Sequence, residues 1–284
     1  MEVKRVGVVG CGQMGGGIVQ ICAQAGYQVV VSEISEDYLQ KGLGNIEKTL
    51  AVAVRKSRIS EEEKDATLTR IRGTTDTADF GDCDLAIEAA IENLELKKKI
   101  FTDLDKKAPA HAILATNSSC LSIMDMAAAT GRPERVVGLH FFNPVPLMKL
   151  LEVVRTIATS EETLAAAREF GDKVGKKVIV ARDMPGFIVN RLLLPQILLA
   201  IRMFEDGAAT REDIDTGLTL GLNHPMGPLA LADLVGLDTV LFIAEGIYRE
   251  LGDAAYLPPV VLRKMVTAGS LGRKTGKGFY EYGN

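Results

Sequence analysis

One histidine in the sequence stands where an acid–base catalyst would be useful. The chain has three histidines, and His140 ends an apolar run that begins at Val136 and is followed by Phe141-Phe142-Asn143-Pro144. In open α/β sheets, ligands bind just beyond the carboxyl ends of the strands. An imidazole there titrates near neutral pH and can accept or donate a proton. A lone histidine is also compatible with a satisfied core residue, so a catalytic interpretation needs partners.

Glu152 is the first candidate partner. It lies inside Leu150-Leu151-Glu152-Val153-Val154, and a carboxylate in such an apolar run is costly to bury unless it is paired. A hydrogen bond to His140 would supply the pair, fix the imidazole tautomer and stabilise its protonated form.

Two further polar residues are candidates. Ser119 lies in Asn117-Ser118-Ser119-Cys120, directly after the predicted strand Ile113–Thr116, where it could also cap a helix beginning near Leu121. Asn190 lies on an otherwise apolar helix face, where its amide needs a ligand or another side chain as partner.

A glycine-rich turn follows the first predicted strand and opens a helix. It reads Gly10-Cys11-Gly12-Gln13-Met14-Gly15. The first glycine permits the tight turn, the second lets the backbone approach a pyrophosphate, and the third allows close helix–strand packing. The free N–H groups and the positive end of the helix dipole can then bind phosphates. Glu33 ends the second predicted strand, where it can accept hydrogen bonds from ribose hydroxyls and would repel a 2′-phosphate. The combination predicts NAD binding; the alternative is that Glu33 is merely a solvated charge.

The elements that must position these residues alternate between short β-branched runs and longer helical patterns, which is typical of a parallel sheet covered by helices. The expected strands are Arg5–Val9, Gln28–Glu33, Leu85–Ala89, Ile113–Thr116, Val136–His140 and Val178–Ala181. The expected helices between them are Met14–Ala25, Glu36–Lys56, Leu94–Lys107, Ser122–Thr130 and Glu161–Val174.

The pattern changes after Asp183, where Met184-Pro185-Gly186 interrupts the chain. Only helical patterns follow, at Ile188–Phe204, Arg211–Leu220, Leu229–Leu251 and Pro258–Thr267. We therefore expect the α/β class, with a Rossmann-type, mostly parallel sheet domain over residues 1–184 and an all-helical domain over residues 185–284.

Composition narrows the function classes. The chain has 284 residues, and its 33 basic against 37 acidic residues exclude a broadly basic nucleic-acid binder. The four cysteines show no CxxC spacing, so we expect thiols in a reducing compartment and no metal site. The longest apolar stretch, Leu192–Ile201, contains Pro195 and Gln196 and is too short to span a bilayer. With no targeting segment at the N-terminus, a cytoplasmic protein without membrane or nucleic-acid partners is expected.

Several segments together resemble the 3-hydroxyacyl-CoA dehydrogenase family, in order and over essentially the whole chain. They are Val8–Gly15, Glu88–Asn93, Leu139–Met148, Pro185–Arg191, Gly221–Leu231 and Thr275–Tyr280. The segments around His140 and Asn190 are far more specific than the glycine motif. The compact length is similar to that of bacterial members that act on 3-hydroxybutyryl-CoA.

The resemblance implies a role for each matching position. His140 would be the catalytic base and Glu152 its orienting partner, while Ser119 and Asn190 would hold the substrate's oxygen atoms. The positions that would line the cofactor cleft, besides the glycine turn and Glu33, are Glu92, Lys97, Asn117, Ser119, Asn143 and Lys274. Lys56 would meet the CoA phosphates.

The activity implied is NAD-dependent oxidation of (S)-3-hydroxybutyryl-CoA to acetoacetyl-CoA, and the reverse reduction, by a homodimer that associates through its helical domain. Two positions depart from the family: it more often has Asp where this chain has Glu33, and Ser where it has Cys120. Alternatives are a dehydrogenase of a free hydroxy acid or sugar acid, and a non-catalytic NAD-binding protein. A lysine-based β-hydroxyacid dehydrogenase would leave the His140–Glu152 pair without a purpose.

Overall fold

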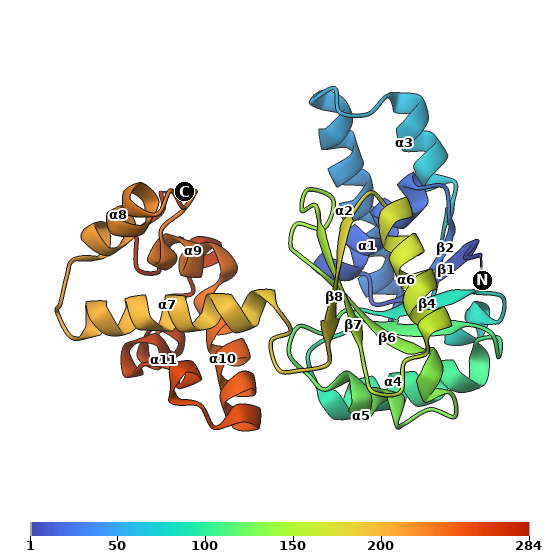
Figure 1. The fold of residues 1–284 in the computed structure, drawn as a ribbon. Coiled ribbons are helices and arrows are strands. Elements are labelled where there is room, and N and C mark those ends of the chain that lie inside the picture. Colours follow the sequence, from blue (N-terminus) through green and yellow to red (C-terminus); the bar gives the residue numbers. More distant parts are fainter. Residues whose placement is uncertain (1, 284) are drawn as a thin grey trace. The chain divides into compact units, whose positions relative to one another are not determined.

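The chain forms two compact units that divide between Met184 and Pro185 (Figure 1). The computed structural model describes residues 2–283. The first unit is built on a β-sheet, and the second is built from helices.

The sheet of the first unit has eight strands in the order β3-β2-β1-β4-β5-β6-β7-β8. Their bounds are β1 Arg5–Val9, β2 Gln28–Ser32, β3 Ile71–Thr74, β4 Leu85–Glu88, β5 Ile113–Thr116, β6 Val136–Phe141, β7 Leu150–Arg155 and β8 Lys177–Arg182. All neighbours run parallel except β6 and β7, which are antiparallel. β2 lies on one side of β1 and β4 lies on the other, so the strand order changes direction between β1 and β4. In such folds, ligands bind in the crevice beyond the carboxyl ends of these two strands.

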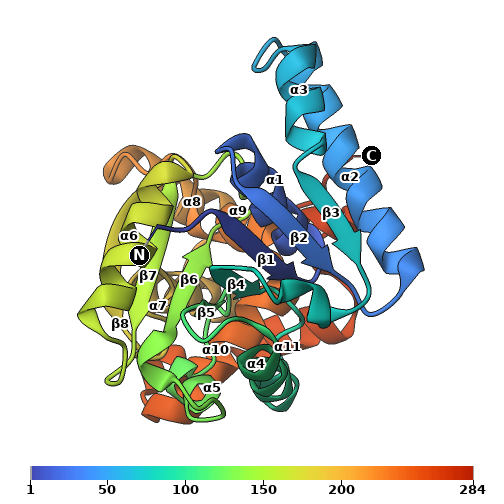
Figure 2. The same ribbon diagram turned by 90° about the vertical axis from the view of Figure 1, so that its right-hand side faces the viewer.

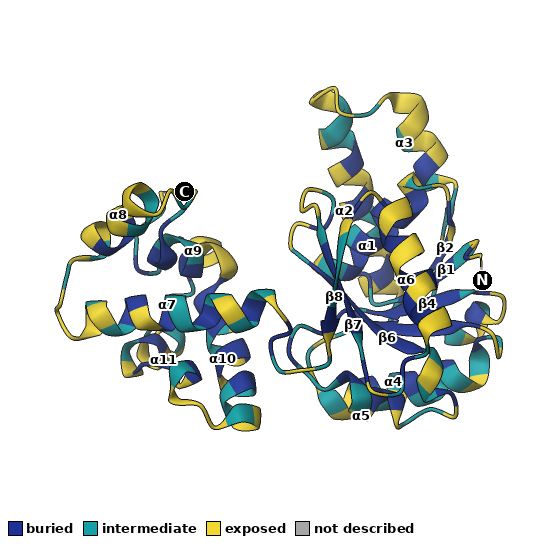
Figure 3. Cartoon of the chain, viewed as in Figure 1, coloured by how far each residue is buried: buried dark blue, intermediate teal, exposed yellow. Residues whose placement is uncertain are grey.

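Helices cover both faces of this sheet. Figure 2 shows α1 (Gln13–Gln24) and α6 (Glu161–Lys173) on one face, and α4 (Leu94–Lys107) and α5 (Ile123–Ala127) on the other. Because both faces are covered, the central strands are apolar almost throughout, and Figure 3 shows them buried while the outer sides of the helices are exposed. The core between α1, α6 and the sheet includes a contact between the rings of Tyr27 and Phe170, 5.6 Å apart.

Two helices extend away from the sheet as a pair, α2 (Glu36–Arg55) and α3 (Glu61–Leu68) (Figures 1 and 2). Ser60 and Glu63 close the start of α3 with a reciprocal capping box, which satisfies two backbone N–H groups that the helix itself leaves unpaired. Short 3-10 turns complete the unit at Thr77–Phe80 and Pro133–Arg135.

The second unit is helical. Its helices are α7 Val189–Glu205, α8 Arg211–Gly221, α9 Pro228–Val235, α10 Leu237–Leu251 and α11 Val260–Thr267, with 3-10 turns at Ala254–Tyr256 and Arg273–Thr275. Asp233, on α9, accepts hydrogen bonds from the backbone N–H groups of Phe279 and Tyr280. This buried carboxylate fastens the C-terminal segment to the helices. Within residues 2–283, none of the helices combines the length and apolarity that crossing a bilayer requires.

The predicted fold class is confirmed, but the sequence patterns missed three elements and merged two others. β3 is an edge strand that contains Arg72 and Gly73 and is only half buried, so it lacks an apolar alternation. β7 was present in the sequence only as an apolar run, and α3 is too polar to show a helical stripe. The expected helix Leu229–Leu251 is wrong: Gly236, at φ 99°, ends α9 and separates it from α10. The expected helix Ser122–Thr130 is shorter, at Ile123–Ala127.

Candidate active site

The glycine turn after β1 requires glycine for distinct reasons. Gly10 has a φ of 97°, and a Cβ there would lie 2.8 Å from the carbonyl oxygen of Ala89. A Cβ at Gly15 would collide with the carbonyl oxygen of Gly10. A Cβ at Gly12 would meet nothing within 4 Å, so there the backbone borders open space. This is the geometry of a turn that holds a ligand against the first N–H groups of α1, contributed by Gln13 and Met14.

Glu33 lies beside this turn. Its Oε1 accepts a hydrogen bond from the N–H of Cys11 at 2.6 Å, and its Oε2 accepts one from the N–H of Ile34 at 3.1 Å. Burial and the neighbouring Glu33 carboxylate raise the pKa of the Cys11 thiol to about 11, so this thiol is neutral near pH 7. Glu33 directly follows β2 and lies beside the glycine turn, where an acidic residue binds the ribose hydroxyls of a dinucleotide in this fold.

A cavity of about 550 Å³ opens between the glycine turn, α2 and the loop after β6. Glu33 and Asn143, which the sequence singled out, both line it. Three lining residues on α2, Lys41, Asn45 and Thr49, were missed. Their four-residue spacing places them on one helix face, and this polar stripe was the signal that could have found them.

His140 and Glu152 are direct neighbours across the antiparallel strands β6 and β7. His140 Nδ1 lies 2.6 Å from Glu152 Oε2, and both side chains are buried. The ring of Phe142 lies 4.6 Å from the His140 ring, centroid to centroid. With Nδ1 held by the carboxylate, the tautomer is fixed and proton exchange falls to Nε2. Register explains the contact: residues 142–149 connect β6 to β7 and bring the residue twelve positions later directly opposite His140.

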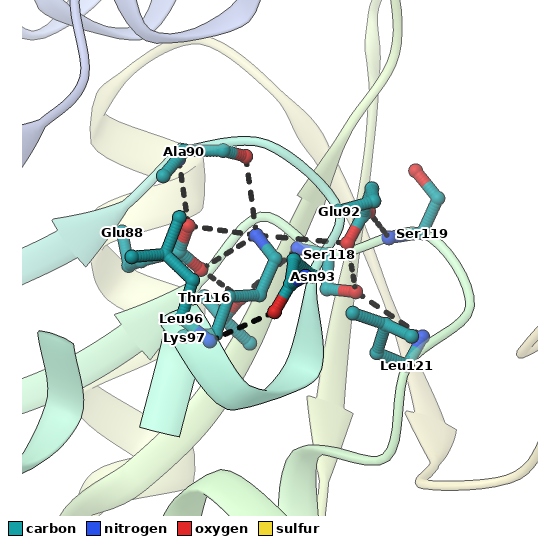
Figure 4. Close-up of polar contacts among 10 residues, drawn as sticks. All are labelled: Glu88, Ala90, Glu92, Asn93, Leu96, Lys97, Thr116, Ser118, Ser119 and Leu121. Carbon is teal, nitrogen blue, oxygen red and sulfur yellow. Dashed lines mark hydrogen bonds and ion pairs between the residues drawn. The ribbon is translucent and has the colours of Figure 1, made fainter. Parts of the chain in front are cut away.

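Lys97 and Glu88 form a buried ion pair at the carboxyl end of β4 (Figure 4). Lys97 Nζ donates to Glu88 Oε1 and Oε2 at 2.7 and 2.8 Å and to the carbonyl oxygen of Ala90 at 3.3 Å. The hydroxyl of Thr116, at the end of β5, donates to Glu88 Oε2 at 2.6 Å. The structure thus buries Lys97, which was expected to line the cofactor cleft, inside a network that joins β4, α4 and β5.

Glu92 extends this network to the loop after β5 (Figure 4). Glu92 Oε2 lies 3.6 Å from Lys97 Nζ and accepts a hydrogen bond from the Ser118 hydroxyl at 2.9 Å. Glu92 Oε1 accepts one from the N–H of Ser119 at 2.7 Å. Helix capping was one possible role for Ser119, but the N-cap of α5 is Ser122, and Ser118 accepts from the N–H of Leu121. Glu92 therefore orients the segment that carries Ser119.

Asn117 connects the ends of β5 and β6, because its Oδ1 accepts a hydrogen bond from the N–H of Phe141 at 3.0 Å. This side chain ties the Ser119 loop to the strand that carries His140. Lys56 follows α2 and is exposed.

The remaining candidates belong to the second unit. Asn190 is buried in the first turn of α7. Lys274 Nζ lies 2.6 Å from Asp238 Oδ2, at the start of α10. Among residues 2–283, no group of His, Cys, Asp and Glu side chains has a geometry that could hold a metal ion.

The doubly wound sheet, the glycine turn with Glu33 and the buried His140–Glu152 pair define an NAD-dependent dehydrogenase. Residues 5–184 match the family model of the 3-hydroxyacyl-CoA dehydrogenase NAD-binding domain, and residues 186–282 match that of the C-terminal domain. The chain belongs to the 3-hydroxyacyl-CoA dehydrogenase family.

Individual relatives agree over the full length. The chain is 49% identical over 280 residues to a 3-hydroxybutyryl-CoA dehydrogenase of Bradyrhizobium diazoefficiens, covering 99% of this chain and 96% of the relative. It is 48% identical over 282 residues to one of Mycobacterium tuberculosis, covering 99% of each. A crystal structure of (S)-3-hydroxybutyryl-CoA dehydrogenase PaaH1 from Ralstonia eutropha is similar with a TM-score of 0.95 and 44% identity, over 100% of both chains.

Proposed function

We propose that this protein oxidises (S)-3-hydroxybutyryl-CoA to acetoacetyl-CoA with NAD and catalyses the reverse reduction with NADH. The observation that carries the proposal is the buried contact between His140 Nδ1 and Glu152 Oε2 at the carboxyl edge of the sheet. It supplies a general acid–base at the edge of the sheet where ligands bind in this fold. The names of the full-length relatives support the choice of a C4 acyl-CoA.

The glycine turn, Glu33 and the open space at Gly12 fit a dinucleotide. Bound NAD would supply the hydride acceptor, and the chain would handle the proton. During oxidation, His140 Nε2 accepts the proton of the substrate hydroxyl while C3 loses hydride and becomes a carbonyl carbon. During reduction, the imidazolium returns that proton to the oxygen. Glu152 stabilises the imidazolium throughout.

Substrate contacts extend the proposal. Ser119, whose backbone is oriented by Glu92, and Asn190, in α7, would bind the substrate's oxygen atoms. Lys56 would meet the CoA phosphates, and its exposed position allows a phosphate to approach. Lys274 would contact the cofactor, with its ammonium held by Asp238.

A homodimer formed through the second unit is a further part of the proposal. Leu192, Leu199 and Met203 are exposed on α7, and their spacing places them on one face of the helix. Light scattering should give twice the mass of one chain, and Leu199→Asp should give a monomer. Ile157→Asp, at an exposed apolar residue of the first unit, is the matched control and should stay dimeric; a monomeric parent protein would contradict this part.

A cytoplasmic location also belongs to the proposal. Its support is cysteine usage: Cys11, Cys22, Cys83 and Cys120 are few for a chain of 284 residues and show no CxxC spacing, which is typical of proteins in a reducing compartment.

The function is tested by NADH oxidation with acetoacetyl-CoA, with free acetoacetate, and without substrate. We expect NADH oxidation with acetoacetyl-CoA, and none with free acetoacetate or without substrate. Equal catalytic efficiency with free acetoacetate would favour a dehydrogenase of free hydroxy acids. NADH binding without turnover of either compound would indicate a non-catalytic NAD-binding protein.

A further inference from the structure

Lys176 is a buried lysine that belongs neither to the glycine turn nor to the His140–Glu152 pair. It lies between α6 and β8, and only 8% of its surface is exposed. Its Nζ donates hydrogen bonds to the carbonyl oxygens of Val145 at 2.6 Å and Met148 at 2.7 Å. Over the described residues 2–283, no carboxylate oxygen lies within 4.0 Å of this ammonium.

A buried ammonium without a carboxylate partner is costly, and its cost must be offset by the hydrogen bonds that it makes. Burial lowers the pKa of Lys176 below its ordinary value. In return, two carbonyl groups of the β6–β7 loop obtain a donor: the bond to Val145 is buried, and the bond to Met148 is partly buried. Charge-assisted bonds of this kind are stronger than bonds between neutral groups, so Lys176 fixes the loop firmly.

The loop in question, residues 143–148, is a compact turn. The N–H groups of Leu147 and Met148 both bond to the carbonyl oxygen of Pro144, at 2.9 and 3.0 Å. Val145 packs so closely on α1 that a Cβ at Gly17 would lie 2.8 Å from the Val145 Cβ. The turn is thus held both by α1 and by Lys176.

This turn is a wall of the cavity. Asn143, Pro144, Val145 and Pro146 line it opposite the glycine turn. The same segment begins directly after Phe142, whose ring contacts that of His140. A displacement of the turn would therefore change the space in which the dinucleotide binds.

We infer that Lys176 is a positioning residue for cofactor binding: its ammonium, acting through Val145 and Met148, holds the β6–β7 turn in the position that the cavity needs. The inference rests on the proposed binding of NAD in this cavity. Without the ammonium, the two carbonyl groups would turn towards water. The turn that forms the wall of the cavity would move with them.

The test measures the NADH dissociation constant by fluorescence and, separately, the urea midpoint of unfolding. Lys176→Met keeps a side chain of similar length but removes the charge and the donor. Lys177→Met is the matched control, because Lys177 is the next residue and is exposed. We expect the dissociation constant to rise at least about fivefold for Lys176→Met. For Lys177→Met it should stay within about twofold of the parent value.

Rescue separates a positioning role from general stability. In Lys176→Ala, added n-propylammonium should restore NADH affinity saturably, because it returns an ammonium at the same reach; 1-propanol and sodium chloride should not. If Lys176→Met does not fold, Lys176→Ala with and without n-propylammonium carries the comparison. A lowered urea midpoint with NADH affinity equal to that of Lys177→Met would overturn the inference. NADH affinity is measured without acyl-CoA, so failure of the parent protein to turn over acetoacetyl-CoA would count against the proposed function instead.

Discussion

Glu33 places a negative charge next to the glycine turn, and its hydrogen bond to the Cys11 N–H fixes where that charge lies. A 2′-phosphate on the ribose would meet this carboxylate, and repulsion between like charges disfavours binding. We expect kcat/KM with NADH to exceed that with NADPH at least about tenfold.

Glu33→Gln keeps the acceptor oxygen for Cys11 but removes the charge, so it should narrow this preference. Glu36→Gln is the control, because Glu36 is an exposed residue three positions later at the start of α2. An unchanged preference in Glu33→Gln would remove the role assigned to this carboxylate.

Lys97 and Glu88 are a second pair for which a single substitution should have a large effect, here on the stability of the fold. Their side chains are 1% and 0% exposed, so removing the ammonium leaves a buried carboxylate without its charged partner. Breaking a buried pair in this way costs about 3–5 kcal/mol. Lys97→Met should therefore lower the urea midpoint of unfolding strongly.

Lys98→Met is the matched control for this effect. Lys98 is the adjacent residue on α4, and its partly exposed ammonium pairs with the exposed carboxylate of Glu95, a contact worth less than about 1 kcal/mol. Equal midpoints for the two variants would show that the Lys97–Glu88 pair contributes no more than a surface contact.

The residues of the candidate site differ in how far the sequence could identify them. His140 stood out because it ends an apolar run and Glu152 because it interrupts one, and the structure places the two in contact. The family resemblance singled out Lys97, but nothing singled out Lys176, and the burial of either lysine could not be predicted because a surface lysine and a buried lysine look the same in a sequence. Their partners, Glu88 for one and the carbonyls of residues 145 and 148 for the other, depend on tertiary packing.

At the scale of elements, the close approach of α2 to the glycine turn shapes the cofactor cavity. A Cβ at Gly42, on α2, would lie 2.5 Å from the carbonyl oxygen of Cys11, whereas a Cβ at Gly44 would meet nothing within 4 Å. Both positions are inside the same helix, so alanine raises helix propensity equally at each, by up to about 1 kcal/mol.

Gly44→Ala should therefore raise the urea midpoint and leave NADH affinity unchanged. Gly42→Ala should push α2 away from the turn and weaken NADH binding, with overpacking that costs about 1–3 kcal/mol. The two variants are compared by fluorescence titration with NADH. Identical affinities would mean that the spacing between α2 and the turn does not matter for the cofactor.

Element types were predictable where periodicity was strong, and the misses have physical causes. β3 is stabilised by pairing with β2 along the edge of the sheet rather than by its own apolar residues. The break between α9 and α10 depends on one backbone angle at Gly236, and an isolated glycine in a helical pattern is compatible with either a continuous helix or an end. α3 did carry a signal in Ser60 and Glu63, three residues apart.

For the whole molecule, the division into an α/β part and a helical part could be predicted, because the change from alternating strands and helices to helices alone involves dozens of residues. The strand order was not predicted from the sequence; right-handed crossovers between parallel strands generate the doubly wound arrangement that the structure shows. The antiparallel turn from β6 to β7 is the exception to the parallel pattern. It is also the feature that brings Glu152 beside His140.

We expect His140 and Glu152 to act as one acid–base unit, and single-turnover reduction of acetoacetyl-CoA by NADH measures whether they do. The four forms compared are the parent protein, His140→Gln, Glu152→Gln and the double variant, with NADH affinity measured separately. We predict a loss of at least about 10²-fold for His140→Gln with NADH affinity nearly intact. The double variant should be scarcely slower than His140→Gln alone, because residues that act as a unit are not additive. A rate near that of the parent protein for His140→Gln, or fully multiplicative losses in the double variant, would contradict the account.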